Sequence, residues 1–114
     1  MSECSHSSKA RPLPSPGSVS AETLSKAVAL FSAMGDPTRL RLLEALTRGE
    51  RCVGDLASDS GASQSAVSHQ LRILRDRGLV VFSRDGNHAI YRLADEHVRT
   101  LLADGLAHAE EDLR

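Results

Sequence analysis

The spacing of apolar residues along the chain predicts a mainly helical domain that carries one small β-hairpin. Four segments between residues 21 and 77 place apolar residues three or four positions apart, as helices with one buried face do. The spacing then changes to two short runs rich in β-branched and aromatic residues, which predict strands over 79–83 and 88–93. Residues 93–114 return to helical spacing, so a last helix follows the hairpin.

The residues at the predicted helix ends support this order. Ser20 and Ser63 are suited to cap helices that begin directly after them, and Asp36-Pro37 combines a capping acceptor with a proline at the first helical position. A short helix over 53–58 precedes the turn at 61–63. Asp85-Gly86 is a strong turn signal between the two strands. A short helix, a tight turn, a longer helix and a hairpin predict a winged helix-turn-helix.

The length and composition indicate one domain with an N-terminal arm. Residues 1–19 are polar and proline-containing, which predicts a disordered arm, and residues 20–114 form the predicted winged helix-turn-helix domain. No apolar run approaches the roughly 20 residues that span a membrane, and no secretion signal is visible. Two cysteines make no disulfide framework. We therefore expect a cytoplasmic protein without a membrane partner.

The charges are distributed unevenly, although the net charge is only −1. Residues 63–92 contain five arginines against two aspartates, net +3, whereas residues 93–114 contain six acids against two arginines, net −4. Such a distribution predicts one segment that faces phosphates and another that faces cations.

The helix predicted over 63–77 has the composition of a DNA-reading helix. Its small polar residues allow close approach to base edges in a major groove, while its arginines suit phosphates or, for Arg72, a guanine. With the hairpin tip, the predicted DNA-binding residues are Gln64, Ser65, Ser68, His69, Arg72, Arg75, Arg84, Asn87 and His88. The alternative is a polar face that only meets water. Because one helix in one groove gives little specificity, we expect a homodimer on double-stranded operator DNA.

Asp95-x-His97 and His108-x-x-Glu111 are candidate metal ligands in the last helix. Two imidazoles and two carboxylates form an ordinary tetrahedral zinc set. The two histidines lie eleven residues apart, so they share one helix face but are separated by roughly 16 Å along it. Zinc–nitrogen bonds are only about 2 Å long, so one helix cannot close both pairs around one ion. An antiparallel second copy of the helix could supply the missing pair, which predicts a metal held across a homodimer interface.

Three other interpretations of these residues are open. Exposed histidines and acids on a terminal helix are commonly a solvated face, and the same fold can serve a metal-independent DNA-binding protein. A zinc enzyme would need an open coordination position. Four matched ligands and no nucleophile motif argue against catalysis, so we do not expect an enzyme.

Three segments resemble the ArsR/SmtB family of metal-responsive repressors: residues 36–43 (DPTRLRLL), 52–57 (CVGDLA) and 63–74 (SQSAVSHQLRIL). The resemblance covers about residues 20–112 and is strongest to the zinc-sensing SmtB branch. In that branch the last helix carries Asp-x-His, ten intervening residues and His-x-x-Glu, and Asp95, His97, His108 and Glu111 match this spacing. The resemblance implies a dimeric repressor that leaves its operator when zinc binds between the chains.

The family also has a second metal location, near the start of the first helix of the helix-turn-helix. Cys52 and Asp55 match it here, and Cys4 and His6 of the arm are candidates to complete it from the other chain. The alternative is a buried Cys52 and a disordered Cys4. Branches that sense soft metals usually carry two cysteines there, but this chain has only Cys52, which argues against soft-metal sensing. The nitrogen and oxygen ligands of the last helix also accept cobalt or nickel, so a repressor that senses another metal, or none, is the alternative function.

Overall fold

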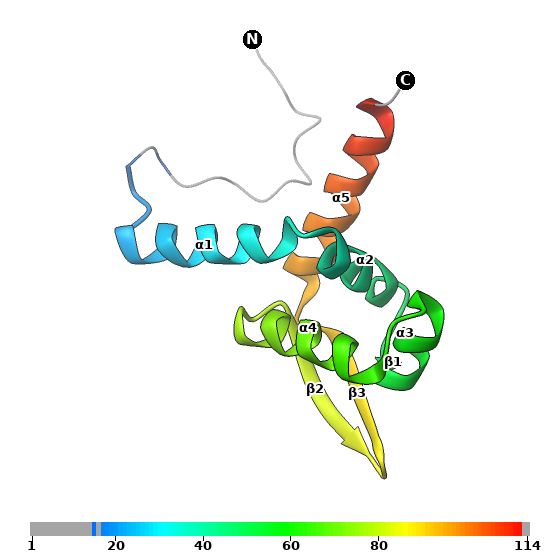
Figure 1. The fold of residues 1–114 in the computed structure, drawn as a ribbon. Helices are drawn as coiled ribbons and strands as arrows, with labels where there is room; N and C mark the ends of the chain where they lie inside the picture. Colours follow the sequence, from blue (N-terminus) through cyan, green and yellow to red (C-terminus); the bar gives the residue numbers. More distant parts are fainter. Residues whose placement is uncertain (1–14, 16, 113–114) are drawn as a thin grey trace.

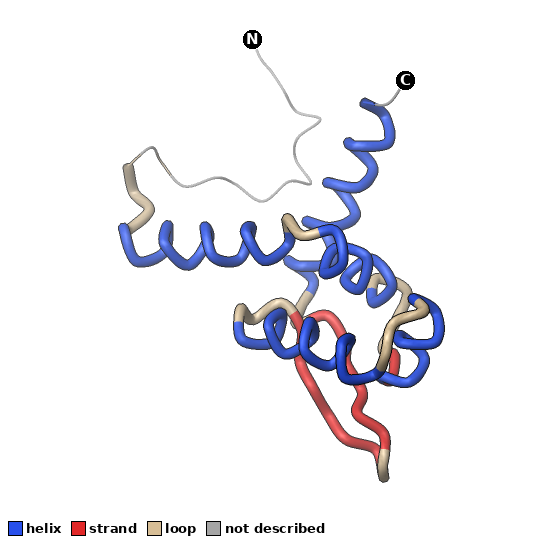
Figure 2. Tube along the Cα trace, in the orientation of Figure 1, coloured by secondary structure: helices blue, strands red, loops and turns tan. Residues whose placement is uncertain are grey.

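The computed structural model describes residue 15 and residues 17–112 (Figures 1 and 2). Along the chain it contains α1 (Ala21–Met34), α2 (Pro37–Leu46), β1 (Arg51–Cys52), α3 (Val53–Ser60), α4 (Gln64–Asp76), β2 (Val80–Asp85), β3 (His88–Leu93) and α5 (Glu96–Asp112). The predicted mainly α fold class with a winged helix-turn-helix is confirmed. Residues 1–14 and 16 of the predicted arm lie outside the described part of the chain.

The predicted capping residues start the helices as expected. Ser20 accepts a hydrogen bond from the backbone N–H of the third residue of α1, Asp36 accepts one from Arg39 at 3.1 Å, and Ser63 accepts one from Ala66 at 3.1 Å. Each bond satisfies an N–H group that has no partner inside its helix. The boundaries of α1, α2 and α4 are therefore determined locally.

The sheet differs from the prediction by one strand. The two-residue strand β1, which was not predicted, pairs antiparallel with β3 through Arg51↔Tyr91 and Cys52↔Ile90, so the order is β1-β3-β2. A two-residue strand carries no alternation of its own, and its pairing depends on residues about 40 positions away in the sequence. The predicted hairpin is thus part of a three-stranded sheet.

The hairpin turn is tighter than predicted. Strand β2 continues to Asp85, which pairs with His88, so only Gly86 and Asn87 connect the strands, whereas the prediction ended the first strand at residue 83. Gly86 has a φ of 62°, which glycine adopts without strain. Glycine at the first central position is typical of two-residue type II′ hairpin turns. The longer strands carry the hairpin tip further from the core.

The hydrophobic core fixes the orientation of α4. Buried leucines from α2, α4 and the start of the hairpin meet in this core: Leu42, Leu43, Leu46, Leu71, Leu74 and Leu79. Helix α5 adds Val98 and Leu102. Full burial of one such side chain stabilises the fold by about 1.5–3 kcal/mol. Because Leu71 and Leu74 face this core, the polar residues of α4 are turned outward. No helix of residues 15 and 17–112 is long and apolar enough to cross a membrane.

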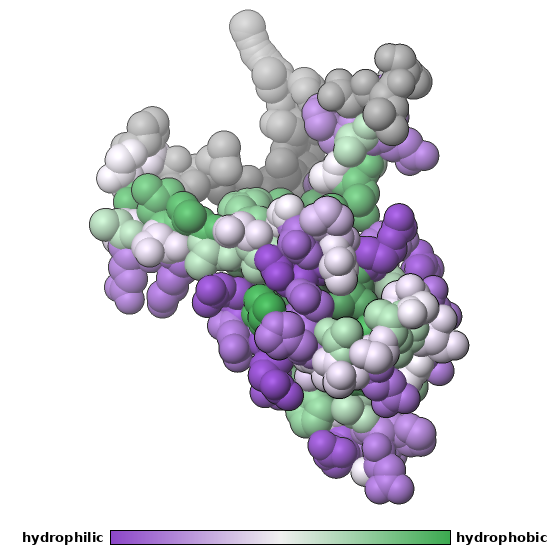
Figure 3. Space-filling model, in the orientation of Figure 1, coloured by the Kyte–Doolittle hydropathy of each residue, from purple (hydrophilic) through white to green (hydrophobic). Residues whose placement is uncertain are grey.

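Helix α1 extends away from this core and leaves much of its apolar stripe uncovered. Leu24, Val28 and Phe31 are 58%, 62% and 55% exposed, whereas Ala33 near the end of the helix is buried. Figure 3 shows the resulting hydrophobic surface along α1. One protomer therefore presents an apolar helix face to solvent, which single globular chains rarely do.

Candidate nucleic-acid interface and metal centre

The predicted DNA-reading residues of α4 lie on its outward face. Gln64, Ser65, His69, Arg72 and Arg75 are exposed, and Ser68 is half-buried, as expected for the side opposite the buried leucines. The preceding helix α3 ends at Gly61, whose φ of 75° allows the tight turn into α4. The structure thus forms a helix-turn-helix whose second helix is free to enter a groove.

The hairpin projects beyond α4 and carries the predicted tip residues. Arg84, Asn87 and His88 are all exposed, and Figure 1 shows the hairpin that carries them extending past α4. They come from the end of β2, the turn and the start of β3. Exposed arginine, asparagine and histidine side chains at a hairpin tip beside a reading helix are suited to contact the DNA backbone next to the major groove.

Three hydrogen bonds between helices, donated by two arginines, were not predicted. The guanidinium of Arg39 donates from Nε to the carbonyl of Ala33 at 2.9 Å and from Nη1 to Gln70 Oε1 at 3.1 Å. Arg39 therefore connects the end of α1 with α4. Arg99 of α5 donates in a similar way to the carbonyl of Thr47, at the end of α2. The sequence contains no signal for these pairs, because each joins residues that only the fold brings together.

Asp95 and His97 are adjacent at the start of α5. Asp95 Oδ1 accepts a hydrogen bond from Val98 N at 3.0 Å, and its Oδ2 lies 3.8 Å from His97 Nδ1. Both side chains are more than half exposed. Two ligands bound about 2 Å from a tetrahedral ion lie roughly 3.3 Å apart, so a small side-chain adjustment brings this pair to ligand spacing. Asp95 thus caps the helix with Oδ1, and its Oδ2 is the oxygen that could bind a metal ion together with His97.

His108 and Glu111 lie exposed at the other end of α5. Within one protomer, the described residues contain no group of three or more His, Cys, Asp or Glu side chains that could hold a metal ion. The four-ligand site itself remains a prediction.

At the second predicted location, Cys52 and Asp55 meet at the start of α3. Cys52 is half-buried, and its Sγ caps the helix by accepting a hydrogen bond from Asp55 N at 3.4 Å. The neighbouring Arg51 is paired with Asp59, and this hydrogen bond raises the pKa of Arg51 above its ordinary value. Cys4 and His6 lie outside the described residues. The hydrogen bond of Cys52 is with the backbone of Asp55, so the structure places both residues at the first turn of α3, and the four-ligand site stays a prediction.

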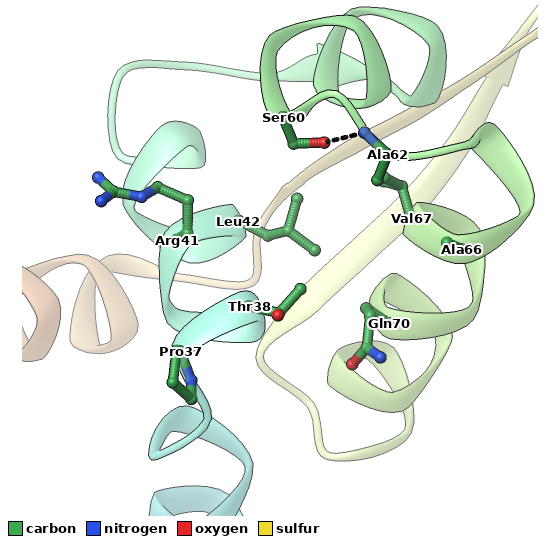
Figure 4. Close-up of a pocket in the computed structure, with 9 residues that line it drawn as sticks. All are labelled: Pro37, Thr38, Arg41, Leu42, Ser60, Ala62, Ala66, Val67 and Gln70. Atoms are coloured by element: carbon green, nitrogen blue, oxygen red, sulfur yellow. Dashed lines mark hydrogen bonds between the residues drawn. The ribbon is translucent and has the colours of Figure 1, made fainter.

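A hollow of about 610 Å³ lies between α2 and the helix-turn-helix (Figure 4). Mostly apolar side chains line it, with Thr38, Arg41 and Gln70 as its larger polar ones. Ser60 Oγ accepts a hydrogen bond from Ala62 N at 3.3 Å at its rim. None of the candidate metal ligands within residues 17–112 lines this hollow, so it is separate from the candidate metal centre on α5.

The fold and the outward polar face of α4 define a winged helix-turn-helix regulator. The family described as bacterial regulatory protein, arsR family, matches residues 36–81, which include α2, α3, α4 and the start of β2. The chain is 53% identical over 81 residues to a transcriptional repressor SmtB homolog of Synechocystis sp., a match that covers 71% of this chain and 61% of that protein. It is 48% identical over 80 residues to the regulator NmtR of Mycobacterium tuberculosis, covering 70% and 67% respectively.

A solved structure extends the agreement to the whole domain. A homodimeric winged helix-turn-helix DNA-binding domain from Mycobacterium bovis matches with a TM-score of 0.80 and 30% identity, over 90% of this chain and 94% of that one. The chain therefore belongs to the arsR family of bacterial regulatory proteins. This membership confirms the predicted resemblance, and also the prediction that the protein is not an enzyme.

Proposed function

We propose that this protein is a homodimeric, zinc-responsive repressor that binds double-stranded operator DNA in its metal-free form and releases it when zinc binds. The zinc ligands are Asp95 and His97 of one protomer with the partner's His108 and the partner's Glu111. The reading surface comprises the outward face of α4 and the hairpin tip. A repressor of this kind acts in the cytoplasm, where bacterial operators lie.

The distribution of ligands along α5 carries this proposal. One pair lies at each end of the helix, roughly 16 Å apart at about 1.5 Å per residue, and the described residues of one chain offer no third ligand to either pair. A two-fold antiparallel arrangement of two α5 helices would join the start of one to the end of the other and form the site twice. Two imidazoles and two carboxylates then complete a tetrahedral set.

The exposed apolar residues support the same dimer. Leu24, Val28 and Phe31 on α1 and Leu101 on α5, which is 37% exposed, give a second copy an apolar surface to cover. Burial of such a surface is the main driving force of stable homodimers. An interface built on α1 and α5 leaves α4 and the hairpin outward on both protomers.

The contacts between helices support coupling of the metal centre to the reading surface. Arg99 links α5 to the end of α2, and Arg39 links the end of α1 to Gln70 of α4. Both dimer-forming helices are therefore hydrogen-bonded to the elements that position α4. A change in how two protomers pack would be transmitted to the spacing of the two reading helices.

When bound, zinc cross-links the two α5 helices through four protein ligands. The chain then holds its protomers in an arrangement in which the two α4 helices fit successive major grooves less well. The coupling between two such sites is typically about 1–3 kcal/mol, and it is reciprocal, so operator DNA weakens metal binding by the same factor. The imidazoles bind metal only when neutral, so acidification weakens the response.

Titration of DNA-bound dimer with zinc, cobalt and nickel tests the proposal, with an operator selected from random duplexes by the metal-free protein. Zinc should release the DNA from the unchanged protein. His108→Gln should bind the operator equally well but keep it when zinc is added. Glu110→Gln is the matched control, because it changes a neighbouring exposed acid of α5 outside the ligand set. Zinc-dependent release from the His108→Gln dimer would place the sensor elsewhere.

A further inference from the structure

Two exposed arginines from different elements stand over one aromatic ring. The Cζ atom of Arg75 in α4 lies 5.4 Å from the ring centroid of Phe82 in β2, and that of Arg84 lies 5.5 Å from it. The ring of Phe82 packs in turn against buried Tyr91, with centroids 5.4 Å apart. Phe82 is therefore held by the sheet and offers a fixed platform for both guanidinium groups.

These residues line a hollow between α4 and the hairpin. Its volume is about 330 Å³, and Arg72 joins Arg75 and Arg84 in its wall, together with the hydroxyl of Ser68. Among the residues that the structure describes, no carboxylate lines it. The hollow thus combines three positive charges and a hydroxyl donor.

The charge of these three arginines is not neutralised by the described part of the chain. The arginines elsewhere in the domain that face a carboxylate within 4.0 Å are Arg41, Arg48, Arg51 and Arg99. Within residues 15 and 17–112, Arg72, Arg75 and Arg84 have no such partner. Three like charges gathered around one hollow repel each other, so the arrangement favours an anion from outside.

We propose that this hollow binds a phosphodiester of the DNA backbone, and that Phe82 is the positioning residue that aligns Arg75 and Arg84 toward it. The inference rests on the proposed DNA-binding function and adds a phosphate contact that the reading helix and the hairpin share. Guanidinium groups are suited to this ligand because their planar fork matches phosphate oxygens. A platform under both groups reduces the rotamer freedom that binding would otherwise remove.

The test measures binding to a mixed-sequence duplex that lacks the operator, because a phosphate contact does not depend on sequence. Affinity is determined at several chloride concentrations. Arg75→Gln and Arg84→Gln should each weaken binding about three- to tenfold and lower the slope of log K against log salt by about one. Arg92→Gln is the matched control, since Arg92 pairs with Val81 and so lies on the opposite face of the hairpin from Phe82. It should change both values less.

The variants of Phe82 separate positioning from folding. Phe82→Leu should weaken binding about threefold, whereas Phe82→Tyr, which keeps the ring, should bind like the unchanged protein. In an Arg75→Gln/Arg84→Gln background, Phe82→Leu should have no further effect, because its partners are gone. If Phe82→Leu weakens DNA binding equally in the unchanged protein and in the double arginine variant, Phe82 only packs in the sheet, and its positioning role is overturned.

A competition experiment with inorganic phosphate tests whether the hollow binds a phosphodiester of DNA or a free phosphate ion. At constant ionic strength, phosphate should displace the duplex no better than chloride does. Binding of phosphate to the free protein that requires Arg84 but leaves the affinity for the duplex unchanged would assign the hollow to a free anion and overturn the proposal. Unchanged salt slopes in both arginine variants would also overturn it. Failure of the unchanged protein to bind any duplex would instead contradict the proposed DNA-binding function.

Discussion

Replacement of Phe31 by alanine tests the proposed dimer interface, because Phe31 is 55% exposed in the protomer. A phenylalanine side chain covers roughly 200 Å², so about 100 Å² is available for burial by the partner. At about 25 cal/mol per Å², this corresponds to about 2.5 kcal/mol per protomer. A two-fold dimer contains the change twice. Because alanine retains part of the contact, we expect the dimer to lose about 3–4 kcal/mol, a two- to three-decade rise in Kd.

Sedimentation equilibrium over a range of protein concentrations measures this Kd directly. Lys26→Ala is the matched control on the same helix, since Lys26 is 78% exposed but lies about 140° around the helix from Phe31. At protein concentrations below the dimer Kd, both variants should unfold at the same denaturant concentration as the unchanged protomer, because neither side chain belongs to the core. An unchanged dimer Kd for Phe31→Ala would refute the assignment of α1 to the interface. A weakened dimer should also bind zinc less tightly at low protein concentration.

Three further substitutions test other parts of the structure. Cys52→Ser should retain zinc-dependent release of DNA, and loss of the response would move the regulatory site to the start of α3. Arg72→Ala should weaken operator binding by about 1–3 kcal/mol in a fluorescence anisotropy titration, and unchanged affinity would remove this part of α4 from the groove. Arg39→Ala should lower the free energy of unfolding by about 1–3 kcal/mol in urea, because it removes the charged donor to Ala33 and Gln70. A stability within experimental error of the unchanged protein would show that these two bonds contribute nothing net.

The helix boundaries could be predicted because their causes lie within a few residues. Ser20, Asp36 and Ser63 cap helices that begin directly after them, and each bond joins residues three positions apart. The outward face of α4 was predictable for a similar reason, because its apolar positions Val67, Leu71 and Leu74 determine which side is buried. The remaining residues of the helix must then face away from the core.

The tertiary structure decided the features that depend on residues far apart in sequence. Strand β1 exists only because β3 lies beside it, and the hydrogen bonds of Arg39 join residues 6 and 31 positions away. The arginines around Phe82 are another case, because only the packing of the hairpin against α4 brings Arg75 and Arg84 over the same ring. The spacing of side chains within one helix or strand cannot predict such contacts between elements.

Some features of the candidate metal centre could likewise be predicted from the sequence, and others depend on the fold. The sequence alone determined which side chains could ligate and that two turns of one helix are too far apart to share an ion, because helix rise is a constant of the backbone. The cap of Asp95 on Val98 and its approach to His97 span at most three positions, so they are as local as the other helix caps. Only the folded chain decided that α1 keeps an uncovered apolar face. Local periodicity specifies the faces of each helix, whereas the packing of the whole chain determines which of those faces remain available to a second copy.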